Sequence, residues 1–240
     1  MGTSLTLVLG GARSGKSVYA QQRAADAGGR VLFVATAEPS DEEMAARIQV
    51  HRAVRPASWH TLEVQRNVGP SIEAVSPAPE VILLDCMTML AGRTLIDLPK
   101  PITSPRACSA LEDEIDSLLV AYERSAARWI IVSNEVGMGI VPETPLGRAY
   151  RDMLGWANQR LAQAADEVLL MVAGLPSWLK RPASAVDPTA RLEAQGVPGA
   201  AGAAAGSRGR HAKRWGDSQG GLGKIPATTS VLPRRDSYPE

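Results

Sequence analysis

Short, almost uninterrupted apolar runs alternate with amphipathic stretches up to about residue 181. Strands that are buried on both faces of a sheet have this character, whereas strands with one wet face alternate apolar and polar residues. The apolar runs therefore predict a mostly parallel sheet covered by helices. Five strands are expected, at LTLVLG (5–10), RVLFVAT (30–36), VILLDC (81–86), RWIIVSN (128–134) and EVLLMVAG (167–174).

Helical periodicity fills most of the intervals between these runs. Gly28-Gly29 is a common helix stop signal, and Ser40 with Glu43 three residues later is a capping-box signature. The proline-rich segment 93–106 is expected to form a loop. The alternation of strand and helix indicates an α/β, doubly wound architecture. Helices are expected over 16–27, 41–54, 107–124 and a stretch that opens at Thr144-Pro145.

The periodic pattern stops at about residue 181, which predicts a folded domain over 1–181 and a tail over 182–240. The tail holds 9 Gly and 6 Pro in 59 positions, with Trp215 and Tyr238 as its aromatic residues. A segment so poor in large apolar side chains buries too little surface to offset its ordering entropy, so disorder is expected. Its basic pieces, RGRHAKR and PRRD, could touch an anion, but a solvated tail is the preferred interpretation.

Composition excludes several classes of protein. A net charge of +1 gives no reason to expect a nucleic-acid partner, and no apolar run reaches the roughly 18–20 residues that a membrane span needs. The N-terminus lacks the features of a signal peptide. Cys86 and Cys108 form no CxxC pair and the histidines do not cluster, which argues against structural zinc or disulfides and fits the cytoplasm.

The chain opens with a phosphate-binding motif, Gly10-x4-Gly15-Lys16-Ser17, placed between a predicted strand and a predicted helix. Glycines let backbone N–H groups surround a phosphate, and the helix N-terminus adds partial positive charge. Lys16 would neutralise β- and γ-oxygens, and the Ser17 hydroxyl would bind Mg²⁺. Asp85, at the end of a buried strand, is placed to hold the same metal, although an aspartate that caps the next turn is the alternative.

A second group of polar residues has less specific spacing. Arg47, His51 and Arg55 recur every four residues, so a helix would place an imidazole between two guanidiniums. Such an imidazole stays unprotonated and is a reasonable nucleophile toward phosphorus. Spacing alone, however, favours an ordinary surface histidine. Asn134 and Glu135 follow another strand end, where open α/β sheets bind ligands, and Arg148 and Arg151 follow them as candidate phosphate contacts.

Together, the stretches GGARSGKS, ATAEPSDEEMAARIQVHRAVRPASWHTLE, LLDCMT and VSNEVGMGIVPE resemble the bifunctional adenosylcobinamide kinase/adenosylcobinamide-phosphate guanylyltransferases of cobalamin biosynthesis. The resemblance covers about residues 5–180, and SNEVGMGIVPE is far more specific than a phosphate-binding loop. It implies a P-loop NTPase with a RecA-like sheet, found in this family as a homotrimer. Its substrates would be adenosylcobinamide, adenosylcobinamide phosphate, GTP and ATP, with Mg²⁺ as cofactor.

The resemblance also implies two reactions. Adenosylcobinamide first receives a γ-phosphoryl group, and GMP is then transferred from GTP through a guanylylated histidine, which is His51 in this sequence. His51 and Lys16 would be the catalytic residues, and Ser17 and Asp85 would bind the metal. The implied nucleotide site comprises Gly10, Gly11, Ala12, Arg13, Ser14, Gly15, Lys16, Ser17, Ala35, Thr36, Ala37, Arg52, Ala53, Val54, Arg55, Glu63 and Asp85.

Three other functions stay open at this point. A simpler P-loop kinase would use Lys16, Ser17 and Asp85 without a covalent adduct. A RecA-like ATPase that acts on DNA would need a basic face, which residues 1–181, at about −2, do not supply. A nucleotide-sensing module would bind GTP without turnover.

Overall fold

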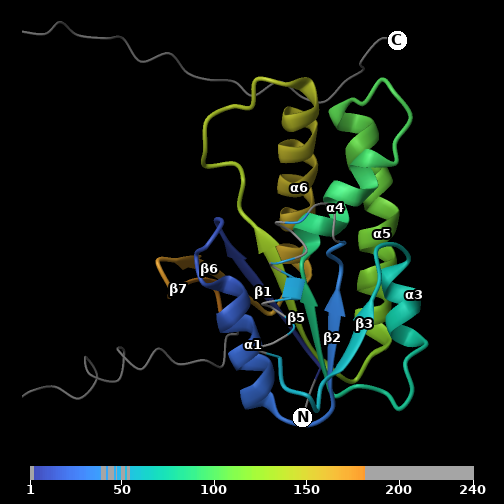
Figure 1. Cartoon of the computed structure of the whole chain (residues 1–240), viewed down its shortest axis with the longest axis vertical. Coiled ribbons are helices and arrows are strands. Elements are labelled where there is room, and N and C mark those ends of the chain that lie inside the picture. Colours follow the sequence, from blue (N-terminus) through green and yellow to red (C-terminus); the bar gives the residue numbers. More distant parts are fainter. Residues whose placement is uncertain are drawn as a thin grey trace, which may run out of the picture. The chain divides into compact units, whose positions relative to one another are not determined.

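A seven-stranded sheet in the order β3-β2-β4-β5-β1-β6-β7 forms the centre of the computed structural model (Figure 1). The structure describes residues 3–38, 42, 46, 48, 49, 52 and 55–181. All neighbouring strands run parallel except β6 and β7, which form an antiparallel hairpin. The strands are β1 (Ser4–Gly10), β2 (Val31–Ala35), β3 (His60–Glu63), β4 (Val81–Asp85), β5 (Arg128–Asn134), β6 (Glu167–Val172) and β7 (Leu175–Lys180).

The five predicted strands are confirmed as β1, β2, β4, β5 and β6, and they occupy the interior of the sheet. The expected end of the last one is wrong, because β6 stops at Val172 and the chain then turns back. Ala173 and Gly174 adopt left-handed backbone angles, with φ of 52° and 82°, and lead into β7. The two strands that the pattern did not predict, β3 and β7, are the edge strands.

The helices are α1 (Lys16–Ala27), α3 (Val68–Glu73), α4 (Met87–Ile96), α5 (Ser104–Arg124) and α6 (Pro145–Ala164). The three predicted helices that lie wholly within the described residues are confirmed as α1, α5 and α6; α3 and α4 were not predicted. Gly28 ends α1 with φ of 67°, and Thr144 caps α6 by accepting a hydrogen bond from the Gly147 N–H. The expected loop over 93–106 is wrong at both ends, because α4 continues to Ile96 and α5 already begins at Ser104.

Two predictions fall mainly or wholly outside the described residues. Within the expected helix 41–54, residues 42, 46, 48, 49 and 52 are described and helical, whereas Ser40 and Glu43 of its capping box are not described. The tail over 182–240 also lies outside the described residues, so its disorder and the boundary at 181 stay predictions.

Helices cover both faces of the sheet, which confirms the doubly wound α/β architecture. Figure 1 shows α1 apart from α3, α4, α5 and α6. Ala20 and Ala24 of α1 pack with Val8 and Phe33 on one face. On the other face, Leu7 joins a larger core with the buried sides of the remaining helices. Among the residues that the structure describes, no helix combines the length and apolar character needed to cross a membrane.

A buried polar link ties α6 to the carboxyl end of β5. The Ser133 hydroxyl donates to Asn158 Oδ1 at 2.6 Å, and Asn158 Nδ2 donates to the Asn134 carbonyl at 3.0 Å. The Asn158 side chain is therefore satisfied at both ends in a site that is almost closed to water. Because a buried polar group without a partner is costly, this amide fixes where α6 meets the strand.

We expect Asn158→Ala to lower the free energy of unfolding by about 1–3 kcal/mol, because it leaves the Ser133 hydroxyl and the Asn134 carbonyl unpaired. Gln159→Ala is the matched control, since Gln159 is the next residue of the same helix and is exposed. Urea unfolding of both variants measures the difference. Equal stabilities for the two variants would contradict a structural role for the amide.

Candidate nucleotide-binding site

The glycine-rich loop lies between the end of β1 at Gly10 and the start of α1 at Lys16. At two positions in this loop, only a glycine fits. A Cβ at Gly10 would lie 2.4 Å from Ser14 Oγ, and Gly15 combines a φ of 91° with a Cβ position 3.2 Å from the Gly174 Cα. The loop therefore curls tightly at both ends, as a phosphate-binding loop requires.

Neighbouring segments hold this loop from two sides. The Gly174 N–H donates to the Ser14 carbonyl at 3.0 Å, so the turn between β6 and β7 supports the loop directly. The Glu135 N–H donates to the Gly10 carbonyl at 3.1 Å, from the residue that follows β5. The shape of the loop thus depends on contacts with residues that are more than a hundred positions away in the sequence.

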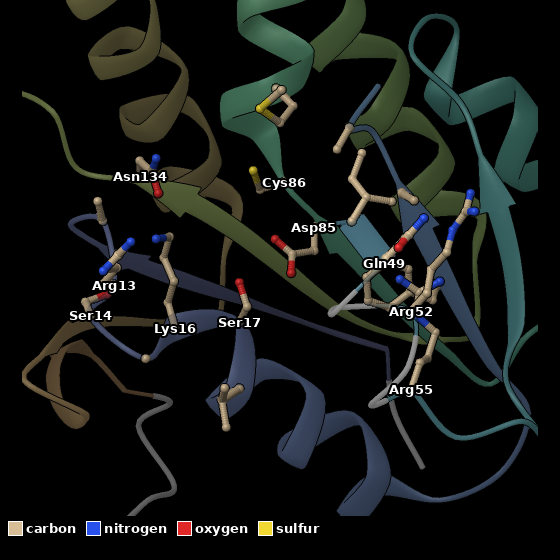
Figure 2. A pocket seen from close by; sticks show the side chains of 18 of the residues that line it. Arg13, Ser14, Lys16, Ser17, Gln49, Arg52, Arg55, Asp85, Cys86 and Asn134 are labelled. Atoms are coloured by element: carbon tan, nitrogen blue, oxygen red, sulfur yellow. The ribbon is translucent and has the colours of Figure 1, made fainter. Parts of the chain in front are cut away.

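A cavity of about 820 Å³ opens beside the loop (Figure 2). Most of the predicted site residues line it, and they come from the ends of several strands as well as from the loop. Those that do are Ala12, Arg13, Ser14, Gly15, Lys16, Ser17, Ala35, Ala37, Arg52, Arg55, Glu63 and Asp85.

Of the other predicted residues, three are described but do not line the cavity, and three lie outside the described residues. Gly10 and Gly11 form the base of the loop. Thr36 is buried, and its hydroxyl donates to the Cys86 carbonyl at 2.7 Å and accepts from the Cys86 N–H at 2.9 Å. That hydroxyl is therefore engaged in holding the ends of β2 and β4 together. His51, Ala53 and Val54 lie outside the described residues.

Lys16 folds back over its own loop. Its Nζ donates to the Gly11 carbonyl at 2.9 Å, and the side chain is almost fully buried. Burial lowers the pKa of Lys16, and the negative charge of Asp85 opposes that shift. Figure 2 shows the Ser17 hydroxyl and the Asp85 carboxylate facing each other in the middle of the cavity.

The opposite end of the cavity carries a pair of arginines. Arg55 lies flat on Phe33, with its guanidinium carbon 3.4 Å from the ring centroid, and its Nη1 donates to Thr61 Oγ1 at 2.9 Å. Burial, followed by repulsion from Arg52, lowers the pKa of Arg55. Arg52 itself pairs with Glu63. The cavity is therefore positive at both ends, with Lys16 at one and these arginines at the other (Figure 2).

Cys86 also lines the cavity, but its thiol is not a nucleophile at neutral pH. Burial, reinforced by the charge of Asp85, raises the pKa of Cys86 to about 11. Because the thiolate is the reactive form, a thiol with this pKa stays protonated and inert. A covalent step in this cavity therefore needs another residue.

Of the residues predicted after β5, Asn134 lines the cavity and the other three have structural partners. Glu135 accepts a hydrogen bond from the Gly137 N–H. Arg148 donates to the Pro142 and Glu143 carbonyls, and Arg151 pairs with Asp152. Several other lining residues were not predicted, because the motifs and apolar runs in which they lie do not reveal which side chain faces a ligand. These are Val18, Phe33, Ile48, Gln49, Gln65, Cys86 and Met89.

Comparison with known proteins places the chain in a family. A family model described as cobinamide kinase / cobinamide phosphate guanyltransferase matches residues 6–179. The chain belongs to this family. The bifunctional adenosylcobalamin biosynthesis protein CobU of Salmonella typhimurium is 46% identical over 181 residues, which cover 73% of this chain and 99% of that protein.

Two further relatives agree with this assignment. The bifunctional adenosylcobalamin biosynthesis protein CobU of Escherichia coli is 43% identical, with 73% of this chain and 99% of that protein covered. The corresponding protein CobP of Pseudomonas aeruginosa is 41% identical over 175 residues, covering 72% of this chain and 96% of that protein. The matched length corresponds closely to the part of this family member that carries the sheet and the cavity.

The support that the β6–β7 turn gives to the loop is testable with a pair of glycine variants. We expect Gly174→Ala to weaken GTP binding on the order of tenfold, because a left-handed residue with a Cβ is strained by about 1–2 kcal/mol and shifts the turn away from Ser14. Gly28→Ala also places a Cβ on a residue with positive φ, 67°, and does so in open space at the far end of α1, away from the phosphate-binding loop. Isothermal titration with GTP, alongside thermal unfolding, separates the two variants. Similar losses of GTP affinity in both would refute a specific role for the turn.

Proposed function

We propose that this chain phosphorylates adenosylcobinamide with ATP or GTP and then transfers GMP from GTP to adenosylcobinamide phosphate. One observation supports this most directly: a single cavity carries a phosphate-binding loop at one end and a pair of arginines at the other. Membership of a family described by both activities supports the same conclusion. The products are adenosylcobinamide-GDP and pyrophosphate, in the assembly of adenosylcobalamin.

In the kinase reaction, the loop from Gly10 to Ser17 holds the β- and γ-phosphates. The hydroxyl oxygen of the aminopropanol arm attacks the γ-phosphorus, the bond to the β-phosphate oxygen breaks, and a nucleoside diphosphate leaves. Lys16 is placed to neutralise the charge that spreads over the phosphate oxygens. To do so, its ammonium exchanges the Gly11 carbonyl for those oxygens.

In the transferase reaction, we propose that His51 is the nucleophile. A ring nitrogen attacks the α-phosphorus of GTP, the α–β phosphoanhydride bond breaks, and pyrophosphate leaves. A phosphate oxygen of adenosylcobinamide phosphate then attacks the same phosphorus and releases the histidine. Arg52 and Arg55 follow His51 in the sequence and line the cavity, so they are placed to neutralise the α-phosphate. Two displacements through a reactive phosphoramidate replace one difficult step.

We propose that Mg²⁺ is held by the Ser17 hydroxyl and the Asp85 carboxylate together with nucleotide oxygens. Both side chains supply hard oxygen donors and face each other in the cavity, which fits a cation that uses few protein ligands (Figure 2). When bound, the ion supplies charge neutralisation on the phosphates. The described residues include no cluster of three or more His, Cys, Asp or Glu, so the nucleotide would complete the coordination.

On the family resemblance, we also propose a homotrimer. Location in the cytoplasm is proposed from the two cysteines, Cys86 and Cys108, which are both free thiols.

The covalent step predicts a labelled protein. With Mg²⁺ and GTP labelled at the α-phosphate, the wild-type chain should acquire label that survives alkali and is lost in acid, as a phosphoramidate does. His51→Ala should abolish the labelling. His60→Ala is the matched control, because His60 is an exposed histidine on edge strand β3, and this variant should label normally.

Two results would overturn parts of this proposal. Cobinamide phosphorylation without any labelling of the wild-type chain would leave a P-loop kinase alone. Labelling that persists in His51→Ala would assign the nucleophile to another residue.

A second prediction concerns the metal. Asp85→Asn should weaken the apparent affinity for Mg²⁺ at least about tenfold in both reactions, because it removes the carboxylate charge from the proposed ligand set. Asp116→Asn is the control, since Asp116 lies on α5 and pairs with Arg160. Magnesium titrations of the kinase rate and of the labelling rate measure the effect. An unchanged magnesium dependence in Asp85→Asn would remove this residue from the proposed metal site.

A further inference from the structure

The loop between β5 and α6, residues 135–144, displays large apolar side chains to solvent. Met138 is 78% exposed, Ile140 is 97% exposed and Val141 is 59% exposed. Single exposed apolar residues are ordinary on protein surfaces, but three within four positions are not. None of the three belongs to either core cluster of the described residues. These side chains therefore do not hold the loop in place.

Val136 packs against the core near the start of the loop, and polar contacts hold the loop at both ends. Glu135 Oε1 accepts from the Gly137 N–H at 2.5 Å near its start. At its end, Arg148 Nη1 donates to the carbonyls of Pro142 at 2.9 Å and Glu143 at 2.7 Å. A loop that is fixed by its own hydrogen bonds while its apolar side chains face water is preorganised for a partner, because little ordering entropy remains to be lost on binding.

The loop begins at the edge of the nucleotide cavity. Asn134, the last residue of β5, lines the cavity and is in register with Gly10 at the start of the phosphate-binding loop. The next residue, Glu135, donates its backbone N–H to the Gly10 carbonyl. Figure 1 shows the chain then rising beyond the carboxyl end of the sheet to the start of α6. The loop therefore starts at the edge of the cavity that holds the phosphate-binding loop.

The size of the cavity decides which substrate is left outside. A volume of about 820 Å³ is in the range of pockets that enclose a single small ligand, and a nucleoside triphosphate would take much of it. Cobinamide is a corrin macrocycle with a flexible aminopropanol arm, and the arm carries the reacting hydroxyl. The arm needs to enter the cavity, whereas the ring, with its methyl groups and methylene edges, has to rest on the surface beside it.

We propose that residues 135–144 form the docking surface for the corrin ring, with Met138, Ile140 and Val141 in contact with its apolar edge. This inference rests on the proposed function, because it names where the acceptor of both reactions binds. The arm of the bound corrinoid extends past Asn134 toward the phosphate-binding loop. The surface selects for the macrocycle, and the cavity performs the chemistry on its arm.

The test is a double variant, Met138→Ser with Ile140→Ser, which removes apolar contact without disturbing a core. The dissociation constant of adenosylcobinamide, measured by isothermal titration, should rise about tenfold or more, given the transfer free energy of two large side chains. Labelling by α-labelled GTP should be unchanged, because that step uses no corrinoid. Leu179→Ser is the control, since Leu179 is 60% exposed on β7 near the opposite end of the sheet, and it should leave corrinoid affinity unchanged.

Other outcomes overturn the inference in distinguishable ways. Unchanged corrinoid affinity in the double variant removes the loop from the binding surface. A reduced molar mass by light scattering in the double variant alone would show that the loop is an interface between copies of the chain. If the wild-type protein binds corrinoid but neither phosphorylates it nor takes label from GTP, the proposed function is refuted. The effect of the double variant on corrinoid affinity would still test whether the loop is the docking surface.

Discussion

The parallel register of the central strands is the constraint on which the site depends. Gly10 pairs with Asn134 across β1 and β5, and Ala35 pairs with both Asp85 and Glu63 across β2, β4 and β3. Strand ends that are level with one another deliver their next residues to the same edge of the sheet. The candidate metal ligand and the arginine–glutamate pair meet at this edge because β2, β3 and β4 end level with one another, and β5 and β1 carry Asn134 and the phosphate-binding loop two residues further.

Electrostatics then divides that edge into two regions. Lys16 is buried at one end, where its ammonium donates to a carbonyl of the loop, and the Arg55 guanidinium lies over the Phe33 ring at the other. Both pKa values are lowered by burial. Both side chains nevertheless stay positively charged, because the ordinary pKa values of lysine and arginine lie far above neutrality. The result is two desolvated positive charges whose attraction for phosphate is stronger than it would be in water.

Whether a strand could be predicted from the sequence depends on its position in the sheet. The five interior strands were predicted because burial on both faces demands continuous apolar runs. The edge strands β3 and β7 were missed because most of their side chains are partly or fully exposed, so HTLE and LPSWLK show no such run. Helix α3 has six residues and contains Pro70, and it gives almost no periodic signal.

The residues of the site likewise divide into those that the sequence marks and those that it does not. The loop and Asp85 were predictable because a motif and a strand end mark them, and Glu63 followed from the family resemblance alone. Phe33 was not predictable as a site residue, because a phenylalanine in an apolar run looks like any core residue. Only the packing of Arg55 on its ring reveals its place in the cavity.

The position of β1 between β5 and β6 has a consequence for the order in which the protein is assembled. Within the described chain, the phosphate-binding loop is synthesised early, whereas both strands that flank β1 come from the second half. The turn that supports Ser14 comes later still, at Gly174. A nascent chain that has emerged only through β4 offers β1 no neighbouring strand. Nucleotide should therefore bind only after almost all of the described chain has left the ribosome, and the nucleotide cannot serve as an early template for folding.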